Sequence, residues 1–120
     1  MEQLDTHQVT ELRDALRRLK SEIEETLDRS KEAAQPVQLD QQAIGRVSRI
    51  DAIQQQKMVE ANRARQRIRL AHVRAALTAI EEDTYGECLH CEEPIAYKRL
   101  LAKPESRICL HCQAALEQKR

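Results

Sequence analysis

The stretch that decides the fold is Tyr85–Cys112, "YGECLHCEEPIAYKRLLAKPESRICLHC", in which the tetrapeptide CLHC occurs twice. All four cysteines of the 120-residue chain lie in these two copies: Cys88, Cys91, Cys109 and Cys112. The pattern C-x2-C-x17-C-x2-C is typical of a metal site in which two knuckles each supply two thiolates. The sequence therefore predicts one tetrahedral zinc ion held by the four cysteines.

This zinc site is expected to be structural. Four thiolates fill the coordination sphere of zinc and leave no position for a reactive water. Thiolates are also too soft for magnesium or calcium. Because so short a module has few apolar side chains, metal binding should supply most of its folding energy. The cations expected to offset the negative charge of the site are Lys98, Arg99, Lys103 and Arg107.

Other uses of the cysteines fit the sequence less well. A thioredoxin-like redox pair needs a βαβ context, which is not predicted here, and a haem site needs a histidine directly after C-x-x-C. Disulfides are rare in a reducing compartment, whereas an iron–sulfur cluster on four thiolates stays open. His90 and His111 lie inside the knuckles and are expected to face solvent, although either is an alternative ligand.

A long helix is predicted from about Thr6 to about Ala34. Its apolar residues recur at spacings of three and four, which indicates a narrow seam that faces one partner helix. These residues are Val9, Leu12, Leu16, Leu19, Ile23 and Leu27. Thr6 is a plausible N-cap, and Pro36 is expected to end the helix.

A second helix is predicted from about Ser48 to about Glu82, and Ser48 with Asp51 has capping-box spacing. One apolar stripe on it consists of Met58, Ala61, Ala64, Ile68, Ala71 and Ala75. A second stripe near its end consists of Leu70, Val73, Leu77 and Ile80. We expect the two stripes to contact the first helix and the cysteine module. If the two helices run antiparallel with Leu16 opposite Ile68, then Leu27 lies opposite Met58 or Lys57.

The two helices are expected to form an antiparallel hairpin that turns inside "PVQLDQQAIG", Pro36–Gly45. Arms of about 30 residues reach roughly 45 Å at the rise of an α-helix. The predicted fold is therefore mainly α: a long antiparallel two-helix coiled-coil hairpin with a small C-terminal four-cysteine zinc-finger module and a short terminal helix. We divide the chain into residues 1–83, with the tip near 36–48, and residues 84–120.

The composition excludes several classes of function. The 20 basic and 20 acidic side chains give a formal net charge of zero, and aromatic residues make up 2% of the chain. Direct nucleic-acid binding usually uses basic grooves and aromatic platforms, so neither feature favours it. No apolar run approaches the roughly 18 residues of a membrane span, and no secretory signal is recognised. We therefore expect a cytoplasmic protein. Because the sequence contains no recognisable catalytic triad or phosphate loop, we do not expect an enzyme.

The run "EEDTYGECLHCEEPIAYKRLLAKPESRICLHCQ", Glu81–Gln113, resembles the zinc finger of the DksA/TraR family. The shared features are the acidic lead-in, the Tyr-Gly pair, the two knuckles and the Pro-Ile, Arg-Leu and Pro positions between them. The resemblance covers about Glu81–Glu117, and the hairpin resembles the family's coiled coil. It implies a monomer that binds bacterial RNA polymerase rather than a DNA sequence. It further implies that the finger enters the secondary channel and modulates initiation together with ppGpp.

The expected tip departs from the family pattern. The acidic motif D-x-x-D-x-A of the best-known members is absent, and the candidate tip residues are Asp40, Asp51 and Ala52. Asp51 is equally consistent with a capping residue, and Asp40 with an N-cap or a turn residue. An alternative function therefore stays open, that of a zinc-finger adaptor that binds nucleic acid or another protein directly.

The stretch "NRARQRIRLAHVR", Asn62–Arg74, contains five arginines. It is consistent with a stripe that binds the phosphates of nucleic acid or ppGpp. We favour a solvated face whose arginines pair with acids of the first helix, such as Glu11, Asp14 and Glu22. Contact with polymerase is a third use that the same residues could serve.

Overall fold

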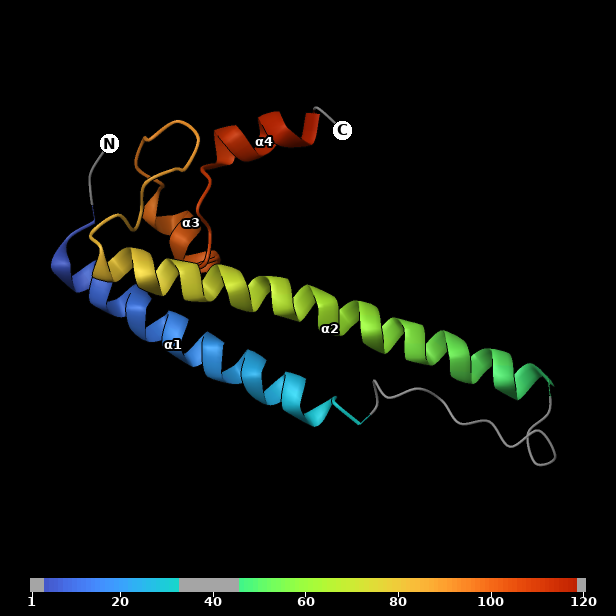
Figure 1. Cartoon of the computed structure of the whole chain (residues 1–120). Helices are drawn as coiled ribbons and strands as arrows, with labels where there is room; N and C mark the ends of the chain where they lie inside the picture. The colour runs from blue at the N-terminus through green and yellow to red at the C-terminus, as the bar shows by residue number, and fades with distance from the viewer. Residues whose placement is uncertain (1–3, 33–45, 119–120) are drawn as a thin grey trace.

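The computed structural model describes residues 4–32 and 46–118, and this part of the chain is mainly helical (Figure 1). Its helices are α1 (Thr6–Arg29), α2 (Arg46–Glu81), α3 (Tyr97–Ala102) and α4 (Leu110–Gln118). The helices α1 and α2 lie side by side and antiparallel, and α3 and α4 gather at one end of this hairpin (Figure 1). The molecule measures 65 × 33 × 20 Å. The predicted mainly α fold is confirmed.

The helix α1 begins with a complete capping box. Asp5 accepts a hydrogen bond from the backbone N–H of Gln8 at 2.7 Å, and the Gln8 side chain accepts one from the Asp5 N–H at 3.0 Å. Two of the free donors of the first turn are thereby satisfied. The prediction of Thr6 as N-cap is wrong by one residue, because only Asp5 has a glutamine three residues later.

The helix α1 ends at Arg29 and not near Ala34, with Ser30 as its C-cap. An arginine of α2 stabilises this end: Arg63 donates hydrogen bonds to the Leu27 carbonyl and, at 2.6 Å, to the Ser30 hydroxyl. Arg63 is only 9% exposed. The last carbonyls of a helix lack partners within the helix, and a cation there also compensates the helix dipole. A side chain from the neighbouring helix therefore caps α1.

Replacing Arg63 with methionine is expected to lower the free energy of unfolding by about 1–3 kcal/mol, since two partly buried acceptors lose a charged donor. Chemical denaturation followed by circular dichroism measures the change. The matched control is Arg65→Met on the same helix, where the side chain is exposed and the expected change is within about 0.5 kcal/mol. Equal effects of the two substitutions would show that Arg63 does not cap α1.

The helix α2 has 36 residues and begins at Arg46. The predicted capping box of Ser48 and Asp51 is therefore wrong, because both residues already lie inside the helix. The C-terminal end at Glu81 agrees with the prediction. The expected tip around residues 36–48 falls largely outside the described residues, and Asp40 lies wholly outside them.

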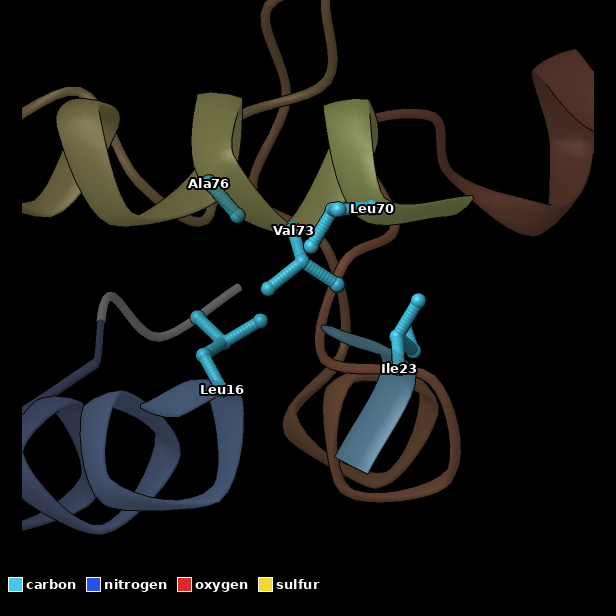
Figure 2. Close-up of a cluster of buried hydrophobic side chains, with 5 residues drawn as sticks. All are labelled: Leu16, Ile23, Leu70, Val73 and Ala76. Carbon is cyan, nitrogen blue, oxygen red and sulfur yellow. The ribbon is translucent and has the colours of Figure 1, made fainter. Parts of the chain in front are cut away.

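The hairpin core joins α1 and α2 through five buried side chains (Figure 2): Leu16, Ile23, Leu70, Val73 and Ala76. The second predicted stripe of α2 thus packs against α1. The first stripe does not, because Met58 is 71% exposed and Ile68 is 59% exposed. Leucine and valine bury more apolar area than alanine, so the shorter stripe of larger residues forms the interface.

The register of the hairpin differs accordingly from the predicted one. The backbone of Leu27 lies beside Arg63, whereas the predicted alignment placed Leu27 beside Met58 or Lys57. The two helices are therefore displaced by five or six positions from that alignment. As a result, α2 continues well past the end of α1.

A second hydrophobic cluster attaches the C-terminal module to α1. Leu12 packs with Cys88, Ile95 and Leu100, all of them buried. The main apolar partner of the module is thus the first half of α1, and Tyr85 also packs against the hairpin core that contains Leu70 and Val73 of the second stripe. The module is not isolated from the hairpin, and the division into residues 1–83 and 84–120 stays a prediction.

The four helices in residues 4–32 and 46–118 include none that is both long enough and apolar enough to cross a lipid bilayer.

Candidate metal centre

The first knuckle is a tight loop that follows α2. The Cys88 N–H donates to the Glu93 carbonyl at 2.9 Å, and the Ile95 N–H donates to the Gly86 carbonyl at 2.7 Å. Gly86 has a φ of 92°, a conformation that favours glycine. A Cβ at this position would lie 3.0 Å from the Leu4 side chain. Gly86 therefore allows the loop to turn and lets Leu4 pack close to its backbone.

The second knuckle leads into α4. Cys109 precedes this helix, and Cys112 lies in its first turn. The two knuckles are tied together by a hydrogen bond of 2.9 Å from the Leu89 N–H to the Arg107 carbonyl. This hydrogen bond joins the first knuckle to the segment just before the second knuckle. The two cysteine pairs therefore lie next to each other.

The four sulfur atoms form one group, in which all lie within 4.8 Å of one another. The Sγ atoms of Cys91 and Cys109 are 3.7 Å apart. A tetrahedron with Zn–S bonds of about 2.3 Å has S–S edges of about 3.8 Å, so the cluster has the size that zinc requires. The same separation excludes a disulfide between these two residues, since that bond is about 2.05 Å long.

Backbone donors make this cluster receptive to a cation. Burial raises the pKa of the Cys88 thiol, but backbone N–H groups of Cys109, Cys91 and His90 outweigh burial and lower it to about 6. In contrast, the Cys109 side chain and burial raise the pKa of Cys112 to about 12. At neutral pH one thiolate is thus ready to bind a metal, and others must release protons as the metal binds.

Zinc affinity is therefore expected to fall as the pH falls. The pKa of Cys91, like that of Cys112, lies above its ordinary value. A backbone hydrogen bond at Glu93 lowers this pKa, but burial and the side chains of Cys88 and Cys109 together raise it by more. Zinc must displace at least these two protons, so log K should fall by about two or more per pH unit near neutrality. Calorimetry in buffers of different ionisation enthalpy counts the protons. Release of clearly fewer than two protons at neutral pH would contradict this account.

Two of the four cations expected around the site, Arg99 and Arg107, have backbone carbonyls as partners. Arg99 Nε donates to the Ile108 carbonyl at 2.9 Å, and Arg107 donates to the Ala75 carbonyl of α2 at 3.4 Å. Both arginines therefore hold the backbone in place around the knuckles. Lys98 and Lys103 are exposed.

Two polar contacts that the sequence did not predict fix the module on the hairpin. Arg69 Nε on α2 donates to Glu105 Oε2 at 2.7 Å, and the Glu105 side chain is 1% exposed. The Tyr97 hydroxyl donates to Glu11 on α1 at 2.8 Å. Neither pairing has a local sequence signal, because each joins residues that are distant in the chain.

The arginine-rich stretch of α2 has several roles. Arg63 caps α1, Arg69 pairs with Glu105, and Arg74 pairs with Glu24 at 3.5 Å. The expected pairing with acids of α1 thus occurs at Glu24. Among residues 4–32 and 46–118, the structure gives no ion pair to the predicted partners Glu11, Asp14 and Glu22.

The remaining candidate residues lie away from the sulfur cluster. His90 and His111 are exposed. Within residues 4–32 and 46–118, the side chains close enough together to bind one metal ion are the four cysteines, and neither histidine is among them. Asp51 is exposed and Ala52 is half-buried. Both belong to the first turns of α2, which lie at the opposite end of the molecule from α3 and α4 (Figure 1).

The fold and the site together define a two-helix hairpin that carries a four-cysteine zinc finger. Residues 83–118 match the sequence model of the prokaryotic dksA/traR C4-type zinc finger. The predicted resemblance to the DksA/TraR family is thereby confirmed for the zinc finger, residues 83–118. The match and the sulfur cluster also confirm one zinc ion as the cofactor, while the role of each cysteine as a ligand stays a prediction.

Two individual proteins are similar to this chain. The RNA polymerase-binding transcription factor DksA of Haemophilus influenzae is 34% identical over 56 residues, which are 47% of this chain and 39% of that protein. The chain thus matches about two fifths of the length of this curated relative. The structure of transcription factor DksA2 from Pseudomonas aeruginosa matches with a TM-score of 0.74 and 22% identity, over 96% of this chain and 87% of that chain. This second likeness shows a shared fold.

Proposed function

We propose that this chain is a zinc-containing transcription regulator that binds bacterial RNA polymerase as a monomer and inserts its helical finger into the secondary channel. The observation that carries the proposal is a DksA/TraR-type zinc finger at one end of an extended two-helix hairpin. The relative from Haemophilus influenzae is named for binding RNA polymerase. The proposal transfers that partner to this chain.

The hairpin has the mechanical features that insertion requires. The helix α1 ends beside Arg63 of α2. The residues of α2 that precede Arg63 therefore extend beyond α1, over a length of about 25 Å at 1.5 Å per residue. The zinc module is attached to the other end of the hairpin by the Leu12 cluster and by the Arg69–Glu105 ion pair. A rigid base of this kind would set the direction in which the finger points.

We assign Asp51 and Ala52 to the part of the finger that approaches the polymerase active site, together with Asp40, which lies outside the described residues. Asp51 is exposed on the second turn of α2, so its carboxylate is free to contact a partner. A regulatory effect that depends on Asp51 should be lost in Asp51→Asn while affinity for polymerase persists.

We extend the proposal to ppGpp, which we place in a pocket of about 240 Å³ between α2, the module and α4. Its walls include Ala75, Leu89 and Ile108, and Lys103 contributes an exposed cation. A Lys103→Gln substitution should weaken ppGpp binding to the polymerase complex. The matched control, Lys98→Gln, removes a charge from the same module at a position outside this pocket.

A competition experiment tests the polymerase proposal. The Haemophilus influenzae relative is labelled with a fluorophore and bound to purified bacterial RNA polymerase, and the zinc-loaded chain is then added. Displacement of the label is expected, because both proteins would occupy the same channel. Binding without displacement would place this chain elsewhere on polymerase, and the absence of any binding would overturn the proposal.

A further inference from the structure

We propose that a groove between α1 and α2 binds the phosphate groups of a small molecule. The groove has a volume of about 720 Å³. Its charged lining residues are Arg13, Arg17, Lys20, Glu24, Arg74 and Glu81. This site shares no lining residue with the pocket that contains Lys103. The inference does not depend on polymerase binding.

Cations from both helices converge on this groove. Arg13, Arg17 and Lys20 follow one another at spacings of four and three residues, which places them on one face of α1. Arg74 faces them from α2. Its ion pair with Glu24 is 3.5 Å long and about half exposed on both sides, so water screens it. Within residues 4–32 and 46–118, the structure gives no ion pair to the three cations of α1.

Arg13 supplies a second, independent observation. Its Nε atom is buried and has no hydrogen-bond partner in the described part of the chain. Buried donors are usually paired in folded proteins, and an unpaired one is costly. Because Arg13 lines the groove, a turn of its side chain would bring this donor to an oxyanion bound there. No other group described in the structure accepts this hydrogen bond.

The arrangement favours phosphate over other anions. Guanidinium groups donate two parallel hydrogen bonds to phosphate oxygens, and two arginines with a lysine can surround a compact, doubly charged group. Leu77 and Ile80 add an apolar wall for the rest of such a ligand. The acids Glu24 and Glu81 also line the groove and would repel a long polyanion. The geometry therefore fits a small phosphorylated molecule better than a nucleic-acid backbone.

The test titrates the full zinc-loaded chain with inorganic pyrophosphate and, separately, with guanosine diphosphate, at physiological salt. Backbone NMR shifts are expected in α1 and α2 around the groove. Arg17→Gln should weaken binding about tenfold, as loss of a charge-assisted hydrogen bond implies. The matched control is Arg18→Gln, the adjacent exposed arginine outside the groove, for which a change of less than about twofold is expected because salt screens distant charges.

The outcomes separate the possible ligands. Tighter binding of the nucleotide identifies the apolar wall as part of the site, and equal affinities identify the diphosphate group alone as the ligand. If Arg17→Gln and Arg18→Gln weaken ligand binding equally, the affinity depends on the overall charge of the surface and not on the groove. This result would overturn the proposal. Shifts produced by an acidic peptide but not by pyrophosphate would also overturn it, in favour of a protein partner.

Discussion

Replacing Cys91 with serine is expected to abolish stable zinc binding and to unfold the C-terminal module. Cys91 is the exposed member of the sulfur cluster, so the substitution removes a ligand with little loss of packing. Structural zinc sites contribute on the order of 10–16 kcal/mol to folding. The loss of one of four thiolates should therefore weaken zinc binding by more than about a hundredfold.

The hairpin should respond differently from the module. Its core consists of residues from α1 and α2, and we expect most of its helix to remain when zinc is lost. The first half of α1 should loosen, because Leu12 packs against Cys88 and Leu100 of the module. Limited proteolysis should accordingly cut the module first and the helices later.

Zinc content, circular dichroism and proteolysis measure these effects in Cys91→Ser and in the wild-type chain with a chelator. The matched control is His90→Ser, because His90 is the exposed neighbour of Cys91 and lies outside the sulfur cluster. It should retain zinc and resist protease. Zinc loss in His90→Ser, or a module that stays folded in Cys91→Ser, would contradict the four-cysteine assignment.

The second large effect is expected from Leu16→Ala, which should lower the free energy of unfolding by about 2–5 kcal/mol. Leu16 has no exposed surface and points from α1 toward Val73 of α2 in the hairpin core (Figure 2). The substitution would leave a cavity between the two helices. Denaturant unfolding followed at the helix signal measures the change.

The matched control for Leu16→Ala is Ile68→Ala on α2. Ile68 belongs to the stripe that is exposed in the structure, so its truncation should change stability by less than about 0.5 kcal/mol. The pair of substitutions therefore decides which stripe of α2 faces α1. A large loss in Ile68→Ala with a small one in Leu16→Ala would restore the register predicted from the sequence.

The parts of the fold that local chemistry determines were predictable from the sequence. The two C-x-x-C knuckles need only their spacing, and the hairpin needs only two long amphipathic segments separated by Pro36 and Gly45. The family resemblance added the zinc finger as a whole, which the comparisons confirmed.

The parts that depend on long-range packing were not predictable. Two apolar stripes on α2 compete for α1, and periodicity alone does not rank an alanine-rich stripe against one with Leu70 and Val73. The end of α1 depends on Arg63, and the attachment of the module depends on Glu105. Both residues look like ordinary surface charges in the sequence, because their partners lie more than 30 positions away.

A site-specific photo-crosslink from position 51 to purified bacterial RNA polymerase tests the central claim most directly. The probe replaces Asp51, which is exposed near the start of α2, and a second variant carries the probe at Lys98 in the module. The account predicts crosslinks near the polymerase active centre from position 51 and crosslinks outside the channel from position 98. Crosslinks from position 51 to the outer surface of polymerase, or none from either position, would contradict insertion of the finger.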